Sequence, residues 1–114
     1  MQDKKFLDRR IFERIPVKLP LRFSYPNSDT EDLAQTQDIS AAGIGLVTDR
    51  ELLPRDHLEM WLQIPDKCEP FHTTGEVVWS NIIEPNKYKV GISFEKAELM
   101  EISRVLRATH SYNS

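Results

Sequence analysis

The sequence has a single cysteine, Cys68, in 114 residues. One cysteine cannot form an intramolecular disulfide, and no cysteine or histidine near it has a spacing that binds metal, so we interpret Cys68 as an ordinary thiol. The three histidines, His57, His72 and His110, stand in unrelated contexts, and no two of them share a metal-binding spacing on one element. The sequence therefore gives no indication of a zinc site.

The motifs of common enzymes are also missing. Ser40 does not lie in a Gly-x-Ser-x-Gly elbow, and no glycine-rich phosphate loop with a lysine follows a predicted strand. Because no nucleophile, base or metal stands in a mutually supporting set, we predict that the protein is not an enzyme and needs no cofactor.

Long apolar runs are absent, since none approaches the ~20 residues that span a bilayer. The first residues lead into charge rather than into a secretory hydrophobic segment. We therefore expect a cytoplasmic protein without a membrane partner.

A strongly basic balance is lacking as well, because the formal net charge is −3. This argues against a protein that coats nucleic acid, which needs a broad basic face. Charge is nevertheless uneven: the first 22 residues hold seven lysines and arginines against three acidic residues. We expect this basic end to bind an anion.

The hydrophobic share of 39% and the charged share of 29% suit one soluble globular domain. Apolar and polar residues alternate with a period of two, which predicts strands over 17–25, 33–39, 44–47, 58–64, 71–83 and 88–94. Over 97–108 the period becomes helical, with Leu99, Ile102 and Leu106 on one face. Residues 1–15 hold alternating charges, and we predict a flexible N-terminal arm there, followed by a domain over 16–110.

Six strands followed by a terminal helix, without β-α-β alternation, predict an all-β protein with a C-terminal helix. The expected architecture is a small six-stranded antiparallel β-barrel.

The stretch Asp38-Ile39-Ser40-Ala41-Ala42-Gly43 stands out at a strand junction. Aspartate and serine side chains bond to backbone two residues on, and we expect Gly43 to supply a positive φ, so the run predicts a rigid polar corner. Upstream, Arg10 and Arg14 are spaced i, i+4. An arginine fork pairs with guanine O6 and N7 or with phosphate, while a carboxylate accepts from the N–H donors of the guanine Watson–Crick edge. The combined set suits a guanine nucleotide.

Arg10-x-x-x-Arg14 followed by Asp38-x-Ser40-x-x-Gly43 resembles the paired signature of PilZ domains, bacterial receptors for the second messenger cyclic di-GMP. The later runs Gly75-Glu-Val-Val-Trp79 and Gly91-Ile-Ser-Phe94 also look like this family, and the likeness covers roughly residues 9–108. The resemblance implies the same barrel fold and a non-enzymatic receptor.

The resemblance also implies a ligand site. The arginines would clamp a guanine and the phosphates, Asp38 would accept from a guanine edge, and Ser40 and Gly43 would present hydroxyl and backbone to the ligand. Arg9, outside the minimal motif, could contact a second guanine or a phosphate. The expected cyclic di-GMP residues are Arg9, Arg10, Arg14, Asp38, Ser40 and Gly43.

We predict that ligand binding orders the arm and so creates a surface for a downstream protein partner. Whether the chain is a monomer or a ligand-sensitive dimer stays open. One alternative is an adaptor that binds protein independently of the nucleotide. A second, disfavoured by the acidic balance, is a barrel that binds single-stranded nucleic acid with Trp61 or Trp79 as stacking platforms.

Overall fold

The computed structural model describes residues 13–113, with side chains described as far as Thr109. Within these residues the chain forms seven strands and one helix. They are β1 (Ile15–Pro16), β2 (Pro20–Ser24), β3 (Asp32–Ile39), β4 (Gly43–Thr48), β5 (His57–Leu62), β6 (Phe71–Glu84), β7 (Lys87–Phe94) and α2 (Leu99–Asn113).

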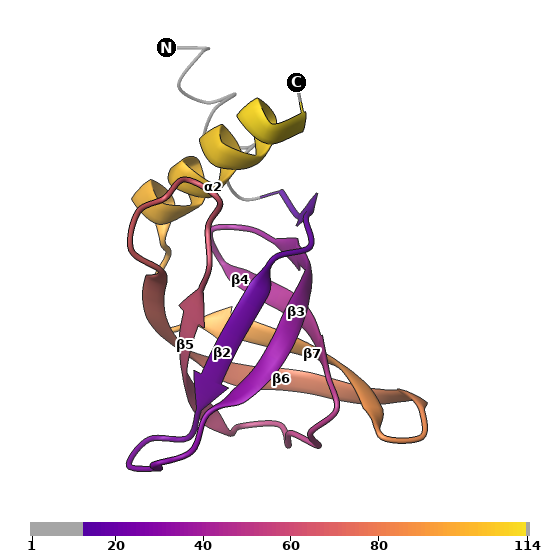
Figure 1. Ribbon diagram of the computed structural model, residues 1–114. Helices are drawn as coiled ribbons and strands as arrows, with labels where there is room; N and C mark the ends of the chain where they lie inside the picture. The colour runs from indigo at the N-terminus through magenta and orange to yellow at the C-terminus, as the bar shows by residue number, and fades with distance from the viewer. Residues whose placement is uncertain (1–12, 114) are drawn as a thin grey trace.

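Six of the strands close into an antiparallel barrel, as predicted. The order β3-β2-β5-β6-β7-β4 is completed by direct pairing of β4 with β3. The two-residue strand β1 extends the far end of β3 by pairing Ile15 with Ile39 and Pro16 with Asp38. Figure 1 shows the closed barrel with α2 lying across one of its ends. Only the last three residues of the predicted arm, 13–15, fall within the described residues.

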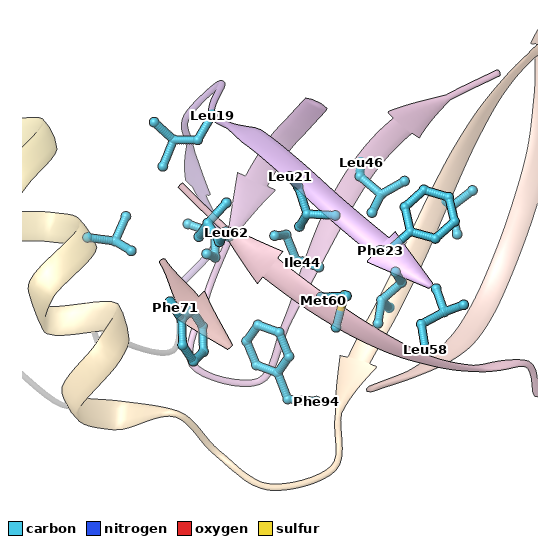
Figure 2. Close-up of a cluster of buried hydrophobic side chains, with 14 of the residues drawn as sticks. Leu19, Leu21, Phe23, Ile44, Leu46, Leu58, Met60, Leu62, Phe71 and Phe94 are labelled. Carbon is cyan, nitrogen blue, oxygen red and sulfur yellow. The ribbon is translucent and has the colours of Figure 1, made fainter. Parts of the chain in front are cut away.

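The barrel interior is filled by the apolar phase of the strands, which explains the period of two in the sequence. Figure 2 shows this core, in which side chains from β2, β4, β5, β6 and β7 meet. Its labelled members are Leu19, Leu21, Phe23, Ile44, Leu46, Leu58, Met60, Leu62, Phe71 and Phe94.

Helix α2 closes the core with Ile102 and Val105, which are 0% and 1% exposed. The expectation that Leu99 belongs to this face is wrong, because Leu99 is 45% exposed in the first turn. The helix also runs beyond the predicted end at residue 108. Within the described residues no helix is both long and apolar enough to cross a membrane.

Polar contacts fasten α2 to the barrel. Arg104 donates from Nε to Asp66 Oδ2 at 2.5 Å and from Nη2 to Asp66 Oδ1 at 3.1 Å. This bidentate hydrogen bonding lowers the pKa of Asp66 to about 2. Just before the helix begins, Glu98 Oε2 accepts a hydrogen bond from Thr73 Oγ1 at 2.7 Å. The helix is therefore held by charge as well as by burial.

At the opposite end of the barrel, Tyr25 holds the connection between β4 and β5. Its hydroxyl donates to Asp56 Oδ2 at 2.7 Å, and the same oxygen accepts from the backbone N–H of Leu53 at 3.1 Å. Burial, followed by the hydrogen bond to the Asp56 carboxylate, raises the pKa of Tyr25 to about 12. This connection is thereby tied to the end of β2.

Candidate functional site

The corner between β3 and β4 is built by its own hydrogen bonds. The Ser40 N–H donates to the Gly43 carbonyl at 2.9 Å, and Ser40 Oγ accepts from the Ala42 N–H at 3.2 Å. Ser40 is buried, so its side chain shapes the corner from inside.

Gly43 is required at this corner for a reason other than the predicted one. No glycine of residues 13–113 has a positive φ, so the expectation of a left-handed Gly43 is wrong. Instead, a Cβ atom at Gly43 would lie 2.2 Å from the carbonyl oxygen of Ile92 on β7. A close approach of two backbones explains the glycine.

A β-bulge sets the direction of Asp38. The β3–β4 register shifts between Thr36 and Asp38, so Gln37 is the extra residue. Thr36 and Ile39 are both buried, whereas Asp38, which lies between them along β3, is partly exposed. Without the bulge, the period of two would place Asp38 on the inner face with Thr36.

Arg14 forms an ion pair with this carboxylate, from Nη1 to Oδ1 of Asp38. The pairing of β1 with β3 brings the two side chains together across 24 positions of sequence. Gly45, opposite Asp38 on β4, leaves room for the carboxylate, because a Cβ atom there would lie 2.9 Å from Asp38 Oδ1.

The row of paired residues that begins with Asp38 on β3 and Gly45 on β4 continues across two more strands. Gly45 pairs with Gly91 on β7, and Gly91 pairs with Trp79 on β6. The Trp79 indole lies over Gly91, since a Cβ atom at Gly91 would lie 2.3 Å from both Cε2 and Nε1. We call this row, Asp38, Gly45, Gly91 and Trp79, the glycine shelf. It lies on the outer face of the barrel, with a carboxylate at one end and a flat aromatic ring at the other.

These groups define what the glycine shelf can bind. The carboxylate accepts hydrogen bonds, the guanidinium of Arg14 donates them in a planar fork, and the indole offers a stacking face. Lys89 is exposed on β7 two residues before Gly91, on the same face of that strand. Among the described residues no group of three His, Cys, Asp or Glu side chains could hold a metal ion. The arrangement suits a planar anionic heterocycle with N–H donors.

A family model for the PilZ domain matches residues 8–109 of the sequence. The chain belongs to the PilZ domain family. The resemblance predicted from the arginine and Asp-x-Ser motifs is thereby confirmed.

Several solved structures share the fold. The PilZ domain of YcgR from Escherichia coli, with c-di-GMP, has a TM-score of 0.65 at 13% identity, covering 90% of each chain. Bacillus subtilis MotI/DgrA, an inhibitor of motility, has a TM-score of 0.64 at 16% identity over 88% of this chain and 49% of its own, so the present chain spans about half of that relative. PlzA of Borreliella burgdorferi, in complex with c-di-GMP, has a TM-score of 0.59 at 15% identity over 91% of this chain and 42% of its own. No curated protein matches the sequence.

The structure brings together four of the six residues expected from the PilZ signature: Arg14 and Asp38 as an ion pair, and Ser40 and Gly43 in the corner beside them. Arg9 and Arg10 lie outside the described residues, so their part in the site stays a prediction.

Sequence reasoning missed the remaining members of the glycine shelf. In the sequence, Gly45 has no role beyond the strand over 44–47. Gly91 and Trp79 stand in runs that resemble the PilZ family, and Trp79 has a suggested role only as a platform for nucleic acid. Two glycines that interrupt apolar strands were the available signal, because an interior glycine often marks a close approach. Their meeting across β4 and β7 required the register.

Proposed function

We propose that this PilZ protein is a receptor for cyclic di-GMP and that the glycine shelf, with Arg14, binds one guanine of the ligand. The observation that carries the proposal is the row itself. It holds an acceptor, a donor fork and an aromatic face on one surface of a domain whose family resemblance implies this ligand.

Each polar group has a partner on guanine. Asp38 has one oxygen paired with Arg14, which leaves Oδ2 to accept from the guanine N1–H and N2–H₂ donors. The Arg14 guanidinium has further N–H groups for O6, N7 or a phosphate oxygen. Because the ion pair already orients both side chains, less conformational entropy is lost when the ligand binds.

The indole of Trp79 supplies the apolar part of the site. Its ring is held over Gly91 and can stack on the purine with its outer face. Lys89 on the same face is available for a phosphate. We further propose that Arg9 and Arg10 complete the clamp, as the PilZ resemblance implies.

Isothermal titration of cyclic di-GMP into the wild type and three variants, Asp38→Ala, Arg14→Ala and Arg22→Ala, tests the polar contacts. We expect Asp38→Ala and Arg14→Ala each to weaken binding by about 5- to 150-fold, because one lost bidentate contact costs ~1–3 kcal/mol. Arg22→Ala is the matched control, since Arg22 is similarly exposed and ion-paired, with Glu31, on another part of the barrel. Equal affinity in all four proteins would refute the site.

The two tryptophans give a matched test of the stacking contact. Trp61 is also half-buried on the outer face, but it lies on β5 beside Arg22 and His72, away from the shelf. We expect Trp79→Leu to weaken cyclic di-GMP binding by about 5- to 150-fold, the range of a lost base–aromatic stack of ~1–3 kcal/mol, and Trp61→Leu to leave it unchanged. Loss of affinity in Trp61→Leu alone would place the ligand elsewhere.

A backbone connection from the corner to α2 supports signalling to a protein partner. The Ala42 carbonyl accepts from the Phe94 N–H at 2.9 Å, and the Ala41 carbonyl accepts from the Glu98 N–H at 3.0 Å. A ligand that shifts or stiffens the corner therefore acts on the end of β7 and on the residue just before α2. We propose that the partner reads this end of the barrel together with the arm over residues 1–15, and that the ligand orders the part of the arm that precedes Arg14.

Hydrogen exchange with and without cyclic di-GMP tests this route. We expect slower exchange at the Phe94 and Glu98 amides in the complex. The Ser28 amide, bonded to the Tyr25 carbonyl at 3.1 Å in the β2–β3 connection, is the control and should not change. Unchanged exchange at all three amides in a saturated complex would contradict the proposed route.

A further inference from the structure

In the part of the chain over 13–113, the outer half of β6 has a neighbouring strand on only one side. Pairing with β5 extends from Phe71 only to Glu76, and the backbone of Val77 then bonds to Arg55 and Asp56 in the preceding loop. From Trp79 to Glu84, β6 pairs with β7 alone among the described residues. Figure 1 shows this two-stranded ribbon extending away from the barrel. A row of backbone N–H and C=O groups is therefore left without a neighbouring strand.

Apolar side chains follow this edge. Val78, Ile82 and Ile83 are 51%, 67% and 50% exposed. Ile82 pairs with Tyr88, whose side chain packs partly against the core. Ile82 therefore lies on the face of the ribbon that turns toward the core inside the barrel, although Ile82 itself lies beyond the barrel's end. Burying such side chains is favourable by about 25 cal/mol per Å² of apolar surface, so a partner that covers them stabilises the complex.

The edge also carries no charge that would repel a second strand. Residues 77–83 are seven uncharged residues in a row, in a chain of which 29% is charged. Natural proteins usually protect an open edge with lysine, proline or bulges. In β6, bulges of this kind occur only at the two ends of the segment, where the register shifts between Val77 and Trp79 and between Ile82 and Glu84. The stretch between them, over 79–82, is regular.

We propose that two copies of this chain pair through the β6 edge, antiparallel and related by a two-fold axis near Asn81. In this arrangement Ile82 faces Ser80 of the other copy, and no residue of the run faces a like charge. The only acidic group at the end of the strand, Glu84, falls opposite Val78 and is drawn toward Lys87 of its own chain at 3.6 Å. The strand edge thus complements itself.

The short regular stretch sets the strength of this dimer. Four residues span only about 14 Å, so the contact lies below the ~1,200 Å² of stable interfaces. The association is therefore weak, and the fraction of dimer rises with protein concentration. The proposal needs no ligand, so it stands or falls separately from nucleotide binding.

Sedimentation of the full chain without nucleotide tests the association. From about 1 µM to about 1 mM protein, we expect the average mass to rise from 13.3 kDa toward twice that value. Ile82→Lys should weaken dimerisation at least tenfold, because it places like charges near each other across the two-fold axis. Leu33→Lys is the control, since Leu33 is 72% exposed on β3, and it should associate like wild type. A monomer throughout, or equal loss in both variants, would overturn the proposal.

Disulfide trapping tests the register independently of the charge variant. Cys68 is exposed, so a Cys68→Ser background removes the native thiol. Asn81→Cys in that background should form a disulfide dimer on mild oxidation, whereas Gln35→Cys, exposed on β3, should not. Equal cross-linking of both cysteines would mean random collision and would refute the pairing at Asn81.

Discussion

Alanine substitutions at Gly43 and Gly45 should separate folding from binding, although the two glycines are two residues apart on β4. At Gly43 a Cβ atom would lie 2.2 Å from the backbone oxygen of Ile92, and at Gly45 it would lie 2.9 Å from the side-chain oxygen of Asp38. A backbone atom in a paired strand cannot move alone, whereas a carboxylate can rotate. The same methyl group therefore has two different consequences.

For Gly43→Ala we expect a loss of stability. Relieving the contact means separating β4 from β7, and overpacking of this kind costs ~1–3 kcal/mol, occasionally more. Since the obstacle is backbone, the upper end of this range applies, and the entropic gain of alanine over glycine, ~0.4–1 kcal/mol, does not offset it. For a domain of this size the loss lowers Tm by about 10–20 °C.

For Gly45→Ala we expect a stable protein with a damaged site. The backbone of Gly45 does not have a positive φ, so alanine fits the strand, and Tm should stay within about 5 °C of wild type. The methyl group displaces the Asp38 carboxylate and breaks its alignment with Arg14. Cyclic di-GMP affinity should fall about 5- to 150-fold, as for Asp38→Ala.

Thermal denaturation and isothermal titration of both variants give the two readouts. A Gly43→Ala protein as stable as wild type would refute the close approach of β4 and β7. A Gly45→Ala protein that is stable and binds cyclic di-GMP normally would refute the carboxylate as a ligand contact. Combining Gly45→Ala with Asp38→Ala serves as a control, since it should weaken binding no further than either change alone.

Three further expectations concern stability. The pKa of Tyr25 in the folded protein is raised to about 12 from 10.0, so its contribution to the free energy of unfolding is full below pH 10 and is lost as pH rises from 10 to 12. Tyr25→Phe should therefore flatten this part of an alkaline denaturation profile. Arg104 lowers the pKa of Asp66 in the folded protein to about 2 from 3.8, so the contribution of Asp66 to the free energy of unfolding is full well above pH 4 and is lost as pH falls from 4 to 2. Asp66→Asn should remove this part of an acid denaturation profile. In urea denaturation, Ile102→Ala should lower the free energy of unfolding by ~2–5 kcal/mol, and substitution of the exposed Met100 by alanine should lower it by less than ~0.5 kcal/mol. Equal losses in the two variants would contradict the docking of α2 on the core.

The barrel could be predicted because its information is local. Leu21 and Phe23 on β2, like Leu58 and Met60 on β5, alternate with polar residues, and one buried face of a sheet imposes this period. The helix was less predictable at its ends. It runs to Asn113, beyond the end at residue 108 that the periodicity predicts, and Leu99 fits the helical spacing without reaching the core.

The site was predictable only as a set of motifs. The sequence places Asp38 and Ser40 in a corner, but the bulge at Gln37 that turns Asp38 outward depends on pairing with β4. Likewise, the role of Gly43 depends on a β7 carbonyl 49 positions away, because close approaches between strands leave no local pattern.

The glycine shelf shows how a closed barrel can hold a site without weakening its core. Along β4, Ile44 and Leu46 point into the core while Gly45 between them faces outward, and Val90 and Ile92 flank Gly91 on β7 in the same way. Where the outward positions lack side chains, the flanking carboxylate and indole lie down against the sheet and present flat polar and aromatic surfaces to a ligand. Ligand contacts and core contacts therefore alternate residue by residue on the same strands. Selection on one face can change affinity while the other face keeps the fold. Asp38→Ala, Gly45→Ala and Trp79→Leu should therefore act on binding and leave the barrel closed, whereas Gly43→Ala, which meets backbone, should not.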